Sequence, residues 1–434
     1  MEQNTFSCNN GLDISFIPFM PASAEDEVEA RIQIRTKHCG ALLDAIITVD
    51  EKEIGRVSEY EVKDFYFFTH RQYYNAGAHT VCVRFKEHCE EKFEETKTSF
   101  CIEEKRLPIL SGGFIMFGPP NDRKACTSFT ADTKKMADDD WEAYIDQMAL
   151  LGIKCIIITT TVQLRTMDGE NTAHYPSSLY PRSDISAKDP VRAVLRVAER
   201  NGQYVFIGLG HTYGGALPHT KEVMTELYSL YGDSPAFYGW YESEEADIRQ
   251  YKEEIWDRWQ ELRGHAITLS PVKPFIISPY AAGENLYPET GGIHPEFLNR
   301  LAREGADFDI IAPQDMVGHT VDGGRLTVKE SGDMYYHLSK VCRVAKKHLW
   351  ANCEAFDFDD GFTLVPRFNG GGMDGENGFL QQLQAVHPYS EKIVTFMLNG
   401  FFLPEGFVPA IGGERAAVQY KIYSEYRHNL TSQI

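Results

Sequence analysis

Long hydrophobic runs are missing from this sequence of 434 residues. No apolar stretch approaches the roughly 20 residues that a membrane-spanning helix needs, so we expect no membrane segment. The N-terminus, MEQNTFSCNNGLD, has neither a basic start nor an apolar core and does not match a signal peptide. The sequence therefore predicts a cytoplasmic protein, or a secreted one if a leader has been removed.

Cysteine motifs and positive charge are also scarce. The nine cysteines include no CxxC pair and no metal-finger spacing, and an odd count argues against a complete disulfide framework. The 63 acidic residues outnumber the 43 basic ones, for a formal charge of −20. A surface this negative repels nucleic acid, anionic lipid and polyanionic substrates such as uronates. We expect no nucleic-acid or membrane partner and a neutral substrate, while the oligomeric state stays open.

The first 106 residues alternate apolar and polar side chains. EARIQIRT places Ala30, Ile32 and Ile34 on one face, and LLDAIITVD, HTVCVRFKE and TSFCIEE repeat the pattern between turn residues. Strands at this spacing, without a convincing helix, predict a small β-sandwich accessory domain over residues 1–106. No catalytic motif falls in it, so a structural or docking module is favoured over a sugar-binding one.

From residue 107 the sequence pattern changes to short apolar runs, each followed by a predicted amphipathic helix. The eight runs are GFIMFG, KCIIITTT, YVFIGLGH, AFYGWYE, PFIISPY, FDIIAPQD, LWANCE and KIVTFML. Eight strand–helix units over residues 107–434 favour a closed (β/α)8 TIM barrel over an open doubly wound sheet. No Gly-rich phosphate loop follows any run, so no nucleotide cofactor is expected. The fold class is α/β, a TIM barrel preceded by a small all-β sandwich.

In a TIM barrel the active site forms where the strands end. Reading those ends gives the polar and aromatic candidates His211, Trp240, Tyr241, Glu242, Glu244, Glu245, Tyr280, Gln314, Asp315, Asn352 and Glu354. A hydrolytic zinc or iron site needs two histidines with a carboxylate or a similar set of three ligands. His211 is the one histidine at a strand end, so we expect no bound metal.

Glu354 is the strongest single candidate. Alternation in WANCE puts Trp350, Asn352 and Glu354 on one face. Burying a glutamate inside the barrel costs free energy unless its charge is paired or serves a function. A glutamate bonded to a barrel lysine or to loop amides is the structural alternative.

A cluster of acids follows the fourth run, in Trp240-Tyr-Glu-Ser-Glu-Glu-Ala-Asp. Acids in a first helical turn can simply interact with the helix dipole, which is the structural interpretation. Four acids beside an exposed Trp240 and Tyr241 indicate more, because aromatic faces stack on sugar rings while carboxylates bond to hydroxyls. Gln314 and Asp315 are expected to orient a catalytic group or bond a hydroxyl; a capping Asp315 is the alternative.

Several motifs in order resemble one known family. GGFIMFG, WEAYIDQMALLGIKCIII, HYPSSLYP, VFIGLG, GWYESEEAD, IIAPQDMVG and LWANCEAF are similar to the TIM-barrel family called domain of unknown function 4434, generally described as glycoside hydrolases by inference from their fold. The resemblance covers about residues 109–430 and leaves out the N-terminal region. It implies a carbohydrate substrate.

The order also resembles the retaining glycosidases that carry an acid/base after strand four and a nucleophile after strand seven. That resemblance implies Glu245 as acid/base and Glu354 as nucleophile, with their carboxyl groups about 5–5.5 Å apart. The clan usually has Asn before the acid/base, whereas here Glu244 precedes Glu245, which leaves Glu242, Glu244 and Glu245 open as the proton donor.

The remaining candidates complete the implied site. Trp240, Tyr241 and Tyr280 would line a sugar platform, and Asn352, Gln314 and Asp315 would bond hydroxyls, with His211 also assigned to substrate binding. Two other classes compete: a non-catalytic glycan-binding barrel, and a metal-dependent aldolase or isomerase with a cation on Asp315, Glu354 and His211.

Overall fold

The computed structural model describes residues 11–118, 132–163, 171–211, 219–281, 285–303, 307–318, 326–358, 364–367 and 378–432, without the side chain of His211. The chain forms two compact units. The first comprises Met1–Arg106 with Ile267–Pro274, and the second comprises Leu107–Ala266 with Phe275–Ile434. Each is described below by itself.

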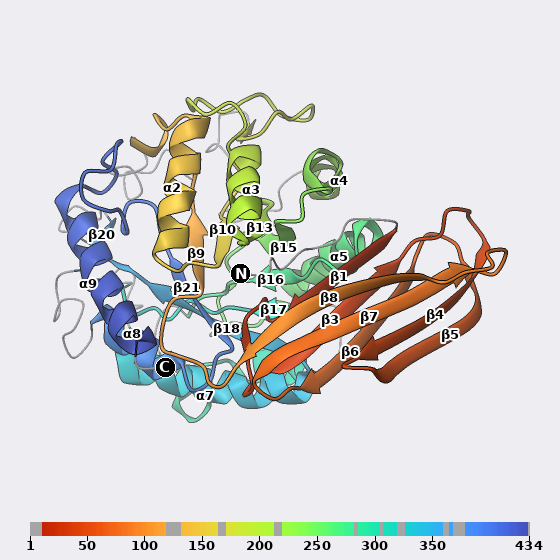
Figure 1. Cartoon of the computed structure of the whole chain (residues 1–434). Coiled ribbons are helices and arrows are strands. Elements are labelled where there is room, and N and C mark those ends of the chain that lie inside the picture. The colour runs from red at the N-terminus through yellow and green to blue at the C-terminus, as the bar shows by residue number, and fades with distance from the viewer. Residues whose placement is uncertain are drawn as a thin grey trace. The chain divides into compact units, whose positions relative to one another are not determined.

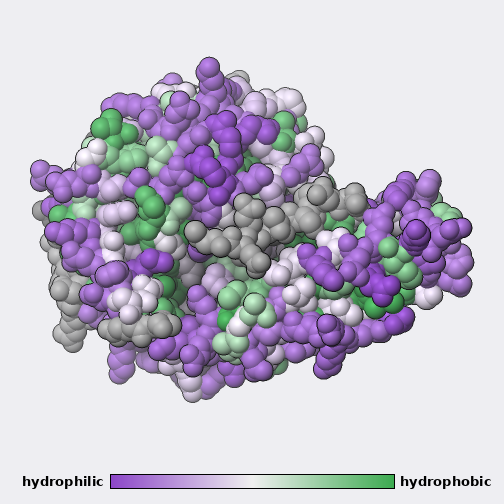
Figure 2. All heavy atoms as spheres, in the orientation of Figure 1, coloured by the Kyte–Doolittle hydropathy of each residue, from purple (hydrophilic) through white to green (hydrophobic). Residues whose placement is uncertain are grey.

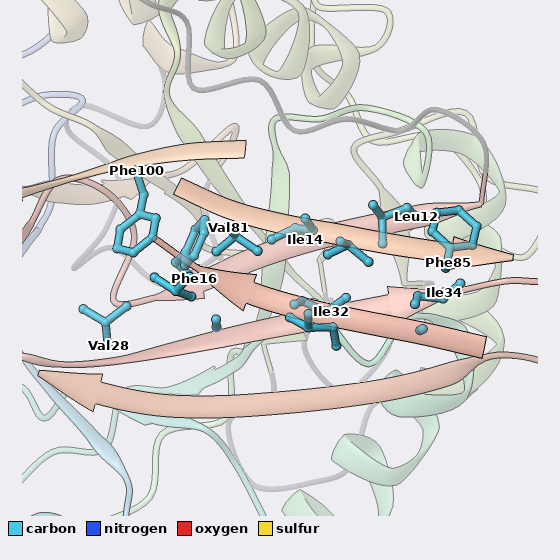
Figure 3. Close-up of a cluster of buried hydrophobic side chains, with 14 of the residues drawn as sticks. Leu12, Ile14, Phe16, Val28, Ile32, Ile34, Val81, Phe85 and Phe100 are labelled. Atoms are coloured by element: carbon cyan, nitrogen blue, oxygen red, sulfur yellow. The ribbon is translucent and has the colours of Figure 1, made fainter. Parts of the chain in front are cut away.

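The first unit is built from two sheets, as its alternating sequence predicts. Their strands are β1 (Leu12–Ile17), β2 (Ala22–Ser23), β3 (Glu27–Ile34), β4 (Ala41–Val49), β5 (Lys52–Val62), β6 (Tyr66–Tyr73), β7 (Gly77–Glu87) and β8 (Glu94–Glu103). The orders are β1-β3-β6 and β2-β8-β7-β4-β5. Both sheets contribute to one hydrophobic core, which includes Ile14, Ile32 and Val81 (Figure 3). The rings of Phe16 on β1 and Phe100 on β8 lie 4.7 Å apart across it. The predicted β-sandwich is confirmed.

The second unit contains the closed parallel barrel that the sequence predicts. In sheet order the strands are β9 (Gly112–Ile115), β10 (Cys155–Ile158), β13 (Tyr204–Gly208), β15 (Phe237–Glu242), β16 (Phe275–Ile277), β17 (Ile310–Ile311), β18 (His348–Glu354) and β21 (Lys392–Phe396), which pairs with β9. Each of the eight apolar runs forms one barrel strand, because a strand covered on both faces by side chains must be apolar throughout.

Helices follow the barrel strands (Figure 1). They are α2 (Asp138–Leu150), α3 (Pro190–Asn201), α4 (Thr220–Tyr231), α5 (Glu253–Leu269), α6 (Pro295–Leu301), α7 (Val328–Ala345), α8 (Phe379–Val386) and α9 (Gly413–Thr431), with a 3-10 turn, η2 (Pro288–Thr290). The caps of α3 show why that helix starts and stops where it does. Asp189 accepts from the Arg192 amide ahead of Pro190, and Gly202 ends α3 at φ 63°, a conformation that glycine adopts without strain.

Short strands stand beyond the ends of several barrel strands. The set β11 (Val162–Gln163), β12 (Thr172–Ala173) and β14 (Gly210–His211) forms one small sheet, and β19 (Phe356–Phe358) pairs with β20 (Leu364–Pro366) in another. These pieces extend the chain past β10, β13 and β18, at the end of the barrel where side chains for chemistry converge.

Aromatic contacts across the barrel establish which side chains point inward. The rings of Phe206 on β13 and Trp350 on β18 lie 5.7 Å apart, and those of Phe114 on β9 and Tyr241 on β15 lie 5.1 Å apart. Neither pair joins neighbouring strands, so both contacts cross the interior. These two pairs fix the inward face of β15 and β18.

Hydrophilic residues cover most of the described surface on the face shown in Figure 2, and hydrophobic ones form small separate patches. Scattered apolar side chains of this kind are ordinary on a protein surface. Within the described parts of the chain, no helix combines the length and apolar character needed to cross a bilayer.

Candidate active site

Strand β18 directs a row of side chains into the barrel. Trp350 points inward, and alternation places Asn352 and Glu354 on the same face. The Asn352 Nδ2 donates to Ser278 Oγ at 3.0 Å, across the intervening β17. Its Oδ1 is buried and accepts no hydrogen bond from any residue that the structure describes. Glu354 ends the strand with 1% of its surface exposed.

The Asp315 carboxylate binds the backbone of Glu354 and fixes its position. Its Oδ1 accepts from the Glu354 amide at 3.0 Å, and its Oδ2 accepts from Gln382 Nε2 of α8 at 2.5 Å. The same amide of Gln382 donates to the Glu354 carbonyl at 3.1 Å. Burial raises the pKa of Asp315, and these donors oppose the rise. Asp315 was expected to orient a catalytic group or to bond a hydroxyl; it is fully buried and bonded to the Glu354 amide, which fits the first role and not the second.

Strand β15 carries its aromatic residues differently from the prediction. Tyr241 points into the barrel onto Phe114, so Trp240 and Glu242 point outward. Trp240 packs edge-on against Phe237, with ring centroids 4.8 Å apart, and is fully buried. The prediction of an exposed pair for stacking sugars is wrong for Trp240 and Tyr241, which are both core residues.

Arg258 forms ion pairs with Glu242, which ends β15, and with Glu244, which follows it. Arg258 of α5 contacts Glu242 Oε1 at 3.1 Å through one terminal nitrogen and Glu244 Oε2 at 3.1 Å through the other. Glu242 is fully buried, and burial raises its pKa to about 7, with Glu244 adding to the rise and Arg258 opposing it. The expected role of Glu242 in binding substrate is therefore corrected: its carboxyl faces α5.

The raised pKa of Glu242 makes a stability prediction. Between the unfolded value of 4.5 and the folded value of about 7, the native state holds a proton that the unfolded state has lost. Stability should therefore fall as pH rises through this window, by about 3 kcal/mol at 1.36 kcal/mol per unit. The glutamine of Glu242→Gln cannot ionise. The free energy of unfolding of the variant minus that of wild type, measured by urea denaturation, should therefore rise by about 3 kcal/mol from pH 4.5 to pH 8.

Glu226→Gln provides the matched control. Glu226 accepts hydrogen bonds from Tyr175, Ser177 and Ser178, and these bonds outweigh its desolvation and lower its pKa. Both states of wild type carry this charge once the pH is about one unit above 4.5, so the difference from the variant should stay flat from about pH 5.5 to pH 8. A flat difference for Glu242→Gln as well would contradict the outward, desolvated position of Glu242.

Glu245 differs from Glu242 and Glu244 because its side chain is exposed. Its Oε1 accepts from Gln314 Nε2 at 3.0 Å, and that nitrogen also lies 3.4 Å from the Ser278 carbonyl. Gln314 in turn forms an isolated parallel bridge with Asn352, two residues before Glu354. Gln314 therefore links the carboxylate of Glu245 to the backbone of β18, the strand that ends in Glu354.

A pocket of about 320 Å³ lies beside Glu245. Its polar lining comes from Glu244, Glu245, Asp247, Gln250, Lys252 and Tyr280, and its apolar lining from Ala246, Ile255, Trp256, Trp259 and Phe297. Of the predicted platform only Tyr280 lines it; burial raises the pKa of Tyr280, and Asp247 and Glu245 add to the rise. Trp256 and Trp259 could not be predicted as lining residues, because their three-residue spacing on an amphipathic helix matches any core-facing pair.

The metal alternative finds no support in the described part of the chain. No group of three or more His, Cys, Asp or Glu residues there is arranged to hold a metal ion. His211 ends β14, and its side chain lies outside what the structure describes. The expected lack of a metal stays a prediction.

Comparisons with known proteins extend these observations. The model of a family described as "Domain of unknown function (DUF4434)" matches residues 110–407. No curated protein matches the chain. Among solved structures, one described as a "putative alpha-L-fucosidase" from Bacteroides thetaiotaomicron VPI-5482 is 21% identical, with a TM-score of 0.54 over 74% of this chain and 96% of that one.

Two other solved structures show weaker likeness. An FMN-binding beta-glucuronidase from Facaelibacterium prausnitzii L2-6 is 12% identical, with a TM-score of 0.42 over 96% of this chain and 61% of that one. A GH2 beta-galacturonidase from Eisenbergiella tayi is 12% identical, with a TM-score of 0.42 over 95% and 71%. At 21% identity the fucosidase likeness shows the fold alone. The other two, with TM-scores below 0.5, add nothing to it.

Proposed function

This chain belongs to the family described as Domain of unknown function (DUF4434), and from that family's barrel and the carboxylates on its rim we propose that it is a retaining glycoside hydrolase acting on a neutral glycan or glycoside. The observation that carries the proposal is the hydrogen bond from the Gln314 side chain to Glu245, together with the backbone bridge from Gln314 to Asn352, two residues before Glu354. The description of the similar barrel as a fucosidase supports the reaction class, and leaves the sugar open.

Glu245 is the proposed acid/base. Of the three glutamates left open by the sequence, Glu242 is buried and both Glu242 and Glu244 pair with Arg258. Glu245 is exposed, lines the pocket and bonds to the rim amide of Gln314. A proton donor must reach the glycosidic oxygen, and this favours Glu245.

The proposed reaction has two steps. A carboxylate oxygen of Glu354 forms a bond to the anomeric carbon while the bond to the leaving oxygen breaks, and Glu245 gives that oxygen its proton. Water then loses a proton to Glu245 and attacks the anomeric carbon, which releases the Glu354 carboxylate. Asp315 and Gln382 keep the end of β18 in place.

A panel of aryl glycosides of neutral sugars, both anomers, tests the proposal. We expect turnover of at least one member and, by proton NMR at early times, a first product with the anomeric configuration of the substrate. Two inversions at one carbon give retention, whereas carboxyl groups about 6.5–9.5 Å apart would place a water between them and give inversion. Binding of glycans without turnover of any member would favour the non-catalytic glycan-binding barrel.

A further inference from the structure

Side chains from two outer helices hold the backbone where β18 ends. The Glu354 amide donates to Asp315, and the Glu354 carbonyl accepts from Gln382 Nε2 of α8 at 3.1 Å. The next carbonyl, that of Ala355, accepts from Gln419 Nε2 of α9 at 3.0 Å. Gln382 and Gln419 are both buried. Two consecutive carbonyls at this strand end are therefore each bonded to a buried glutamine.

Gln419 also joins the end of β18 to the small sheet that follows it. Strands β19 and β20 pair with Phe356 opposite Pro366, so the next pair along this register is Ala355 and Arg367. The Gln419 Oε1 accepts from the Arg367 amide at 2.9 Å, while its Nε2 donates to the Ala355 carbonyl. One carboxamide thus bonds a donor and an acceptor on paired segments, in the place where a backbone hydrogen bond would join them.

The burial of Gln419 makes these two bonds important. Gln419 has no exposed surface and lies between Ala416 and Tyr423, the other buried residues of α9. A buried amide costs free energy unless it is hydrogen-bonded, and the same holds for a buried backbone group that loses its partner. An apolar side chain at this position would leave the Ala355 carbonyl and the Arg367 amide without their partner.

The position of β19 is linked to the carboxyl group of Glu354 through Gly318. Gly318 lies in the loop after β17, and a Cβ on it would overlap the Phe356 carbonyl oxygen and lie 3.2 Å from Glu354 Oε2. The same point of the loop therefore packs against β19 and against the carboxyl group. Because closely packed groups transmit strain, a shift of β19 would displace this loop and the carboxyl beside it.

We propose that Gln419 is a positioning residue for Glu354: its carboxamide fixes Ala355 and β19, and through them the carboxylate that attacks the anomeric carbon. The inference rests on the proposed function, because it takes Glu354 as the nucleophile. Gln419 is fully buried and acts through the backbone, without touching substrate. A nucleophile must approach within a narrow range of distance and angle, and misplacement by about 1 Å can cost about 10²-fold in rate.

Gln419→Leu removes both hydrogen bonds and keeps the size of the side chain. We expect kcat/KM to fall about 10²-fold. The factor should be the same for a dinitrophenyl glycoside and for a disaccharide of the sugar that wild type accepts, because both need nucleophilic attack and only the disaccharide needs a proton. The melting temperature checks folding. If Gln419→Leu does not fold, Gln419→Asn keeps the amide, is one methylene too short to reach both partners, and should lose at least about ten-fold on both substrates.

Gln203→Leu is the matched control. Gln203 is also buried, and its Nε2 donates to the Ile153 carbonyl at 2.9 Å, just before β10. Residues at this N-terminal end of the barrel serve stability, so the variant should lose stability and keep kcat/KM within a few-fold of wild type. A folded Gln419 variant with kcat/KM in the range of this control, or with a loss that depends on the leaving group, would overturn the inference.

Hydrogen exchange at the Arg367 amide gives a second readout that needs no turnover. Without its acceptor, this amide should exchange faster in the folded Gln419 variant than in wild type, and at the wild-type rate in Gln203→Leu. An unchanged rate in the Gln419 variant would overturn the bridge between Ala355 and Arg367, and with it the positioning role. Faster exchange together with a wild type that turns over no glycoside would overturn the proposed function, while the bridge itself would stand.

Discussion

Glu354→Gln is expected to fold like the wild type and to lose at least ~10³-fold in turnover, about 4 kcal/mol of barrier. The amide keeps the shape of the side chain and removes the negative charge that would attack the anomeric carbon. Its backbone contacts to Asp315 and Gln382 do not depend on that charge. The measurement is kcat on the best aryl glycoside of the panel, with the melting temperature as the check on folding.

Glu391→Gln is the control for this variant. Glu391 pairs with His348 at 2.9 Å, at the start of β18, whereas Glu354 ends the same strand. Residues at the N-terminal end of a barrel strand serve stability, so kcat should stay within a few-fold of wild type even if the melting temperature drops. Full activity in Glu354→Gln on a substrate that wild type cleaves would rule out Glu354 as the nucleophile.

Glu245→Gln should have an effect that depends on the leaving group. For a disaccharide, whose departing alkoxide needs a proton, we expect kcat/KM to fall by about 10³-fold, within the usual range for general acid catalysis. A dinitrophenyl glycoside needs little protonation, so its first step should stay near the wild-type rate. Hydrolysis of the glycosyl-enzyme needs Glu245 as base, so a burst of dinitrophenolate followed by a slow phase should be visible by stopped flow.

Glu244→Gln separates this role from a general effect of charge. Glu244 pairs with Arg258 and is adjacent to Glu245, so its loss should affect good and poor leaving groups alike. If Glu244→Gln rather than Glu245→Gln showed the dependence on leaving group, the proton donor would be Glu244 and the assignment of Glu354 would stand. Equal losses for Glu245→Gln on every leaving group would rule out acid/base catalysis at Glu245.

The sequence predicts the barrel well because each strand signal is local. Runs such as CIII at Cys155–Ile158 are apolar at every residue, as strands buried on both faces must be. The helix that follows begins at Pro190 and is ended by Gly202, and both residues are typical of those positions. The order of the strands follows from repetition of one unit. The sandwich can be predicted equally well, because β4 alternates buried and half-buried residues along most of its length.

The orientation of side chains at the end of β15 could not be predicted in the same way. The register between β13 and β15 shifts between Val205 and Phe206, so simple alternation counted from the start of the strand assigns the wrong face. The outward position of the Glu242 carboxyl depends on its contact with Arg258, which lies sixteen residues later, on α5. The burial of Asp315 depends on Gln382 of α8, and neither partner is marked by any local pattern.

Helix α5 supplies both the counter-ion of Glu242 and Glu244 and the tryptophan wall of the pocket, which has a practical consequence for protein engineering. A mutagenesis library confined to the loops after the strands, the usual targets in TIM barrels, would leave Trp256, Arg258 and Trp259 unchanged. Libraries that include α5 must vary these three positions together, since the indole packing and the ion pairs share one helical turn.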